Sequence, residues 1–156
     1  MLLMVISDST TLIILFDLDR MELLSNLFSQ ILIPEVVYKE ISVKHDIVLS
    51  EFIEVVSVKE NETLKLLKQL LDEGESEAIA LALEQKSKLI IDEKKGRKIA
   101  LAQGLEIIGL LGIVYLNIKR EFLSKKEAKI FLDKALQHGY RINSKLISTM
   151  FVNIEE

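Results

Sequence analysis

Five short runs of apolar and β-branched residues recur along the chain, separated by longer stretches with helical periodicity. The runs are Leu2–Ile6, Gln30–Ile33, Phe52–Val58, Lys88–Ile91 and Glu106–Ile108. Short strands that alternate with helices are typical of βαβ units around a parallel sheet. Hydrophobicity within the runs is continuous rather than alternating, as a sheet covered on both faces requires. The pattern predicts one three-layer αβα domain over residues 1–156, with a parallel sheet of about five strands.

The boundaries of several predicted helices carry signals of their own. Gly74 is expected to end a helix over Asn61–Asp72 and to separate it from another over Glu75–Gln85. Ser124 and Glu127 have the spacing of a capping box, which opens a helix in the last part of the chain. The C-terminal third is therefore expected to be helical.

The composition limits the kinds of metal site, catalysis and nucleic-acid binding that this chain can support. The 156 residues are 49% hydrophobic, which is ample for one folded domain. Zero cysteines exclude a disulfide framework, a zinc ribbon and thiol catalysis. With only two histidines, a metal site would have to be built from oxygen ligands. A net charge of −4 argues against a chain held to nucleic acid by bulk positive charge.

The first apolar run does not resemble a secretory signal, because no Lys or Arg precedes it and Asp8 interrupts it. The longest uncharged runs, Leu23–Pro34 and Ile107–Ile118, have 12 residues each. A membrane-spanning helix needs about 20. A cytoplasmic protein that does not enter the membrane is expected.

Asp8 and Asp92 each directly follow a predicted buried strand. Ligands of parallel α/β sheets bind at the carboxyl ends of strands, beside the point where the strand order reverses. The alternative is that each aspartate only caps the helix that follows it. Two such residues weaken that alternative without removing it.

Glu40 shares a helix face with the apolar residues Val36 and Val37, which lie four and three positions before it. A carboxylate on a core-facing stripe is costly unless it is paired or bound to a metal. The alternative is a position at the rim of the sheet, where the side chain reaches water.

Glu77 directly precedes the apolar run Ala78–Leu83, so it is expected to lie beside the sheet. Glu75 is instead assigned to an exposed first turn, where the helix dipole favours a negative charge. Each helical residue advances by about 100°, so these two glutamates point about 200° apart and cannot both face one pocket.

If Asp8, Glu40, Glu77 and Asp92 converge, their mutual repulsion requires cations. Mg²⁺ or Mn²⁺ prefers such oxygen ligands. The chemistry that then becomes available is attack of metal-activated water on a phosphodiester.

The chain resembles the PIN-domain family, the fold of prokaryotic VapC-type ribonuclease toxins. The matching segments follow the family order over almost the whole chain: VISDSTTLIIL, LIPEVVYKEI, GESEAIALALE, LIIDEKKGRKIA and GLLGIVYLNIKREFLSKKEAKIFLDKALQHGYRIN. The resemblance implies a strand order of 3-2-1-4-5 and an acidic pocket at the carboxyl ends of the strands. In that order, the segments that carry Asp8 and Asp92 are neighbours.

By position, Asp8, Glu40, Glu77 and Asp92 resemble the four family acids, and Thr10 matches a small polar residue that supports the site. The third acid is Glu where many toxins have Asp. The resemblance implies a divalent-metal-dependent endoribonuclease that acts on RNA, and further the toxin of a toxin–antitoxin pair inhibited by a small antitoxin protein.

Two further expectations concern surfaces. The basic residues Lys94, Lys95, Arg97 and Lys98 follow Asp92 and are weak candidates for RNA binding, the alternative being a solvated helix face. Apolar residues over Gly109–Ile118 and in the final helix predict a homodimer, which is common in the family.

A different class of function remains open. In that alternative the protein is a non-catalytic, PIN-like interaction module whose acids serve only as caps. Divalent-metal binding distinguishes the two, because scattered acids would bind none.

Overall fold

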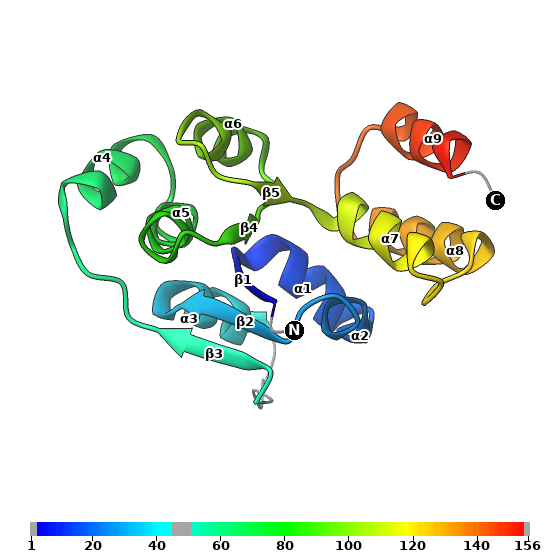
Figure 1. Cartoon of the computed structure of the whole chain (residues 1–156), viewed down its shortest axis with the longest axis horizontal. Coiled ribbons are helices and arrows are strands. Elements are labelled where there is room, and N and C mark those ends of the chain that lie inside the picture. The colour runs from blue at the N-terminus through cyan, green and yellow to red at the C-terminus, as the bar shows by residue number, and fades with distance from the viewer. Residues whose placement is uncertain (1–2, 45–50, 155–156) are drawn as a thin grey trace.

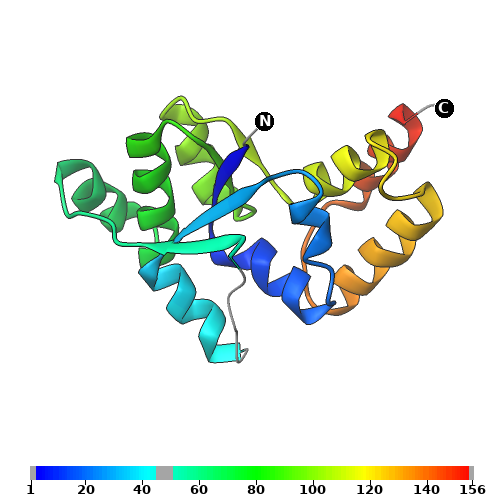
Figure 2. The same cartoon turned by 60° about the horizontal axis from the view of Figure 1, so that its bottom comes forward.

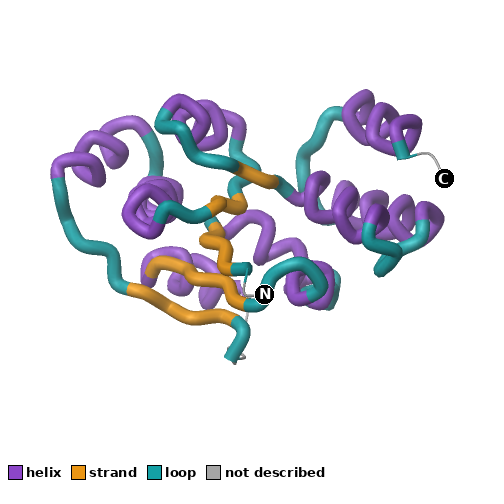
Figure 3. Tube along the Cα trace, in the orientation of Figure 1, coloured by secondary structure: helices purple, strands orange, loops and turns teal. Residues whose placement is uncertain are grey.

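The computed structural model describes residues 3–44 and 51–154, and these form a five-stranded parallel sheet of order β3-β2-β1-β4-β5. The strands are β1 (Met4–Ser7), β2 (Gln30–Pro34), β3 (Ile53–Val56), β4 (Lys88–Ile90) and β5 (Ile107–Ile108). The strand order and the five predicted runs are thereby confirmed; Leu2 of the first run lies outside the described residues. Figure 3 shows the strands lying side by side, with helices on both sides of the sheet.

Helices connect the strands and form the C-terminal third (Figure 1). Their bounds are α1 (Ser9–Asp17), α2 (Glu22–Ser25), α3 (Glu35–Lys44), α4 (Glu62–Leu70), α5 (Glu73–Gln85), α6 (Lys94–Ala102), α7 (Leu110–Lys119), α8 (Lys125–Gln137) and α9 (Ser144–Asn153). In Figures 1 and 2, α4 and α5 lie on one side of the sheet, whereas α7 and α8 lie on the other.

Successive strand residues point into two separate cores, because side chains of a strand alternate between its faces. Val5 belongs to a core that also contains residues of α1, α2, α3, α7 and α8. The next residue, Ile6, belongs to a second core built with α4, α5 and α6. Both side chains are fully buried. This alternation explains the continuous hydrophobicity of the strands and confirms the αβα layering.

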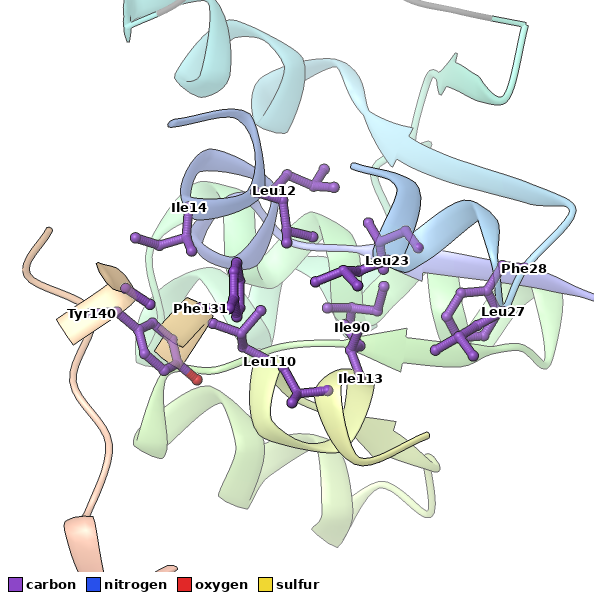
Figure 4. Close-up of a cluster of buried hydrophobic side chains, with 14 of the residues drawn as sticks. Leu12, Ile14, Leu23, Leu27, Phe28, Ile90, Leu110, Ile113, Phe131 and Tyr140 are labelled. Carbon is purple, nitrogen blue, oxygen red and sulfur yellow. The ribbon is translucent and has the colours of Figure 1, made fainter. Parts of the chain in front are cut away.

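The C-terminal third completes the first core rather than forming a separate unit. Leu110 and Ile113 of α7 and Phe131 of α8 are buried against Leu12 and Leu23 (Figure 4). The predicted capping box is confirmed, since the Ser124 hydroxyl accepts from the Glu127 N–H and the Glu127 carboxylate accepts from the Ser124 N–H.

The segment Gly109–Ile118 differs from its expected role as an apolar surface. Five of its aliphatic or amide side chains are buried within the chain's own cores. These are Leu110, Ile113, Val114, Asn117 and Ile118. It therefore supplies little of the surface on which the homodimer prediction was based.

The expected helix end at Gly74 is wrong. The fifth helix already begins at Glu73, because the Asp72 carboxylate caps it by accepting from the Glu75 N–H over 2.8 Å. Gly74 lies in the first turn and faces Glu40, where a Cβ atom would lie 2.5 Å from Glu40 Oε1. Glycine is needed here for close approach of a neighbouring carboxylate, not for ending a helix.

Candidate active site

The carboxyl ends of β1 and β4 lie side by side. Ser7 faces Ile90 across the two strands, and the Asp8 N–H donates to the Ile90 carbonyl oxygen over 3.0 Å. The predicted proximity of the segments carrying Asp8 and Asp92 is confirmed for the backbone. Their side chains nevertheless enter different surroundings.

The Asp8 side chain lies in an acidic cluster and is only 4% exposed. Burial raises the pKa of its carboxyl to about 8; the Ser9 backbone N–H opposes this shift, and the charges of Glu75, Asp72 and Glu40 add to it. Asp8 occupies the N-cap position of α1 but makes no side-chain capping hydrogen bond. Apart from the Ser9 N–H, the described residues at the start of the helix therefore offer this buried acid no partner.

Glu40 reaches the same cluster from α3. Burial raises the pKa of its carboxyl; the Ser9 side chain lowers it, and the charges of Asp72, Glu73 and Glu77 raise it further. Its Oε1 atom is buried and has no hydrogen-bond partner among the described residues. An unpartnered buried carboxylate oxygen costs free energy, so this position is better suited to a ligand than to a solvated rim.

Glu75, not Glu77, is the glutamate of α5 that acts on Asp8. Glu75 is 7% exposed, and burial raises the pKa of its carboxyl to about 7, with Asp72, Glu93 and Glu40 contributing repulsion. Glu77 is half-buried. Burial raises its pKa as well, but the charges that act on it most are those of Lys68, Glu73, Glu35 and Glu60.

The assignment of Glu75 to an exposed first turn is thus wrong. Glu75 lies three and four positions before the fully buried Ala78 and Ile79, so it shares the buried face of the helix. Gly96 of α6 packs against it, and a Cβ atom there would lie 3.3 Å from Glu75 Oε2. Glu75 is the glutamate of α5 whose charge acts on Asp8, whereas the charge of Glu77 acts on Glu40. The expectation that only one of the two faces the pocket stays a prediction.

Asp92 is engaged by residues from three distant parts of the chain. Its carboxylate accepts hydrogen bonds from the Thr11 hydroxyl, from the Leu110 N–H over 3.2 Å and from the Tyr140 hydroxyl over 2.5 Å. The Leu110 N–H belongs to the first turn of α7, so Asp92 stabilises the start of that helix. It does not cap α6, whose N-cap is Glu93.

The close approach of Asp92 to α7 depends on Gly109. A Cβ atom on Gly109 would lie 2.5 Å from Asp92 Oδ1. Tyr140 is 8% exposed and contacts Asp92 from the edge of the first core, near Leu110 (Figure 4). Burial raises the pKa of the Tyr140 hydroxyl well above its usual range, and the charge of Asp92 adds to the shift. The tyrosine remains a hydrogen-bond donor to Asp92.

Two threonines in the first turn of α1 contact acidic residues that follow β4. The Thr10 hydroxyl donates to Glu93 Oε1 over 3.5 Å, whereas its neighbour Thr11 contacts Asp92. The sequence interpretation chose Thr10 and missed Thr11, which faces inward and is buried. It also missed Tyr140, since no local pattern marks a contact between residues 48 positions apart.

The basic residues after Asp92 are exposed on α6. Lys94 lines a cavity of about 730 Å³ together with Thr10, Asp92 and Glu93. Arg97 lines a second cavity, whereas Lys95 and Lys98 line neither of the two. Gly96 does not leave room for a ligand, because Ile91 and Glu75 occupy the space that its side chain would take.

The donor chemistry fits a divalent cation, although the side chains do not form a closed cage. Within residues 3–44 and 51–154, no three His, Cys, Asp or Glu side chains already surround one point at which a metal ion could be held. Asp8, Glu40 and Glu75 are nevertheless buried or half-buried carboxylates with raised pKa values, and one oxygen of Glu40 is unpartnered. Carboxylate oxygens in this state are suitable ligands for Mg²⁺ or Mn²⁺.

Comparison with known protein families shows which family the chain belongs to. The family DUF3368, described as a PIN domain, matches residues 4–156. The chain belongs to the PIN-domain family. PIN domains are mostly metal-dependent nucleases and typically bind divalent metals. A comparison with curated proteins found no match to this PIN domain. Among its described helices, none is long and apolar enough to cross a membrane.

Proposed function

We propose that this PIN domain is a Mg²⁺- or Mn²⁺-dependent endoribonuclease whose acidic pocket contains Asp8, Glu40 and Glu75, with Asp92 at its border. Glu75 takes the place that sequence reasoning assigned to Glu77. The proposal is supported by family membership and by the position of the pocket at the carboxyl end of β1, beside the reversal of strand order.

One observation carries the proposal. Asp8, at 4% exposure, is surrounded by the negative charges of Glu75, Asp72 and Glu40 without a basic partner among the groups that shift its pKa. A chain that used these residues only for stability would pair them or expose them. A bound cation would remove the repulsion and satisfy the unpartnered Glu40 oxygen.

The residues have separable tasks in this proposal. Asp8, Glu40 and Glu75 would hold the cation, which when bound activates water and stabilises the leaving oxygen of a phosphodiester. Thr11, Tyr140 and the Leu110 N–H fix the Asp92 carboxylate in one orientation. Lys94 lies in the adjoining cavity and would contact a phosphate of the substrate.

The test is cleavage of a single-stranded RNA with and without Mn²⁺ or Mg²⁺, with chelator as the blank. Glu75→Gln should abolish cleavage, because it removes a cation ligand without a change of shape. Glu77→Gln is the matched control on the same helix and should retain most of the activity. Both variants should melt as cooperatively as the unaltered protein.

Each contrary result has a distinct meaning. Loss of activity in Glu77→Gln alone would restore the assignment from the sequence. Full activity in both variants, or activity unaffected by chelator, would contradict the acidic-pocket mechanism. Absence of both cleavage and metal binding in the folded protein would favour the non-catalytic interaction module.

We further propose that the enzyme is the toxin of a toxin–antitoxin pair. A small antitoxin with a basic side chain would neutralise the acidic pocket in place of a cation. Co-purification with the product of the neighbouring reading frame should suppress cleavage, and undiminished cleavage in that complex would contradict the inhibitory model.

The homodimer also remains a proposal: a solution mass near 17.8 kDa at micromolar concentrations would overturn it.

A further inference from the structure

A second cavity lies beyond Asp92 and Tyr140. It encloses about 410 Å³ and is lined from β5, α6, α7 and the C-terminal segment. Asp92, Tyr140 and Arg141 line both this cavity and the one of about 730 Å³ beside Thr10 and Glu93. The two cavities therefore adjoin each other at Asp92 and Tyr140.

The cavity contains two arginines in a chain of negative net charge. Arg97 and Arg141 are exposed, and neither forms an ion pair with a carboxylate in the part of the chain that the structure describes. Arg97 approaches the start of α7 and the Asp92 carboxylate, since a Cβ atom on Gly109 would lie 3.3 Å from Arg97 Nη1 and 2.5 Å from Asp92 Oδ1. Guanidinium groups that form no ion pair keep donors available for a phosphate.

The rest of the wall is apolar and aromatic. Leu111 and Tyr115 are four residues apart on α7 and therefore share the helix face that lines the cavity. Ile142 and Leu146 line it from the C-terminal segment. Tyr115 is half-buried, so its ring is held by the protein yet remains accessible. Such a wall suits a flat, partly apolar group.

We propose that this cavity binds one nucleotide of the single-stranded substrate, with the base against Tyr115 and Leu111 and the phosphate at Arg97 and Arg141. The inference rests on the proposed nuclease function and specifies where the strand leaves the acidic pocket. Its volume is within the range of about 300–1,000 Å³ that is usual for small-ligand sites. Stacking on aromatic rings beside basic groups is the general way in which proteins hold single strands.

Binding of 5′-AMP to the full chain in EDTA tests this inference without requiring metal or cleavage. Isothermal titration should show AMP binding more tightly than inorganic phosphate, because the base contributes contacts. Arg97→Met should weaken AMP binding at least tenfold, whereas Arg120→Met, which removes an exposed arginine beyond the other end of α7, should change it less than twofold.

A second pair of variants tests occupancy of the cavity. Leu146→Trp places a bulky ring where Leu146 lines the cavity, and should abolish AMP binding. Val152→Trp makes the same kind of change on an exposed position of α9 that lines none of the cavities described here, and should leave binding intact. Since both positions are exposed, both proteins should fold.

The outcomes separate this inference from the proposed function. AMP binding with no RNA cleavage would uphold the nucleotide site and contradict the nuclease. Cleavage without AMP binding at millimolar concentration would overturn the nucleotide site alone. Equal binding of phosphate and AMP, or equal AMP affinity in Leu146→Trp and Val152→Trp, would also overturn it.

Discussion

Asp8 and Glu75 are carboxyl groups whose surroundings oppose their ionisation. Burial is the first cause for both, and the repulsion among neighbouring acids adds to it. Folding thus buries carboxyl groups that are costly to ionise, and a bound cation would offset that cost.

The apo protein should lose stability as pH rises. The pKa of Asp8 is about 8 in the folded chain against 3.8 as its ordinary value, so the folded state binds more protons between these limits. Stability must then fall with rising pH in that interval, by up to about 1.4 kcal/mol per pH unit for one group. Urea unfolding in EDTA from pH 5 to pH 8 should show this, and Asp8→Asn should flatten the profile.

A profile that rises with pH in EDTA, or one that Asp8→Asn leaves unchanged, would contradict the burial of an uncompensated acid. Glu75 contributes in the same direction, because its pKa is also raised, to about 7. The Asp8→Asn profile should therefore keep a smaller negative slope below about pH 7.

The effect of Gly74→Ala on the free energy of unfolding should depend on Glu40. In the native chain the added methyl would lie 2.5 Å from Glu40 Oε1, so the Glu40 carboxylate must move and the variant should be no more stable than the unaltered protein. In a Glu40→Ala background the space is free, and alanine should stabilise the helix by up to about 1 kcal/mol relative to glycine. Urea unfolding of the four proteins measures this coupling; additive effects would show that the contact is absent.

At the scale of elements, Asp92 adds hydrogen bonds between parts of the chain that also pack together in the first core. It binds Thr11 of α1, the first N–H of α7 and Tyr140 from the connection between α8 and α9. Capping of α7 by a residue 18 positions earlier makes the C-terminal third depend on the end of β4.

Tyr140→Phe should show the strength of this connection. The variant loses a hydrogen bond to a charged group, which is worth about 1.5–3 kcal/mol, while the ring keeps its place in the core. It should also reduce cleavage through a misaligned Asp92. Tyr38→Phe on α3 is the control and should change stability by less than 0.5 kcal/mol, about the size of a neutral surface substitution. Equal unfolding free energies for the two variants would contradict the role of the hydroxyl.

Elements with a local signal could be predicted from the sequence, and contacts between distant elements could not. Strand periodicity and the capping box at Ser124 depend on neighbouring residues, so their predictions are confirmed. The start of α5 depended on choosing between Asp72 as a cap and Gly74 as a break, and the expected break at Gly74 is wrong. The sequence favours Glu77 because it adjoins the apolar run, although Glu75 lies three and four positions before the buried Ala78 and Ile79. Nothing in the sequence around Tyr140 reveals its bond to Asp92.

The whole molecule combines a net charge of −4 with an acidic pocket, so cation binding should be strongly linked to its folding. Millimolar Mn²⁺ or Mg²⁺ should raise the melting temperature, with a stabilisation of about 2.7 kcal/mol when the free metal is one hundred times its Kd. The increase should be larger at pH 8 than at pH 5, because protons compete for the same oxygens.

Thermal melts at both pH values measure this linkage, and Glu75→Gln provides the comparison. At pH 8, above the Glu75 pKa of about 7, the variant should begin more stable than the unaltered apo protein, because a repelling charge is removed. It should gain less stability from metal, because one ligand is removed. An unchanged melting temperature at millimolar metal would contradict a cation site in this pocket.

The long sequence separations between Asp92 and its partners also set the order in which its hydrogen bonds can form during synthesis. Its carboxylate accepts from a residue 81 positions earlier and from another 48 positions later. During synthesis β4 can pair with β1 before Tyr140 has been made, so the hydrogen bond from the Tyr140 hydroxyl is the last of the three around Asp92 that can form. The orientation of the Asp92 carboxylate is therefore completed late in folding, after the sheet that positions it.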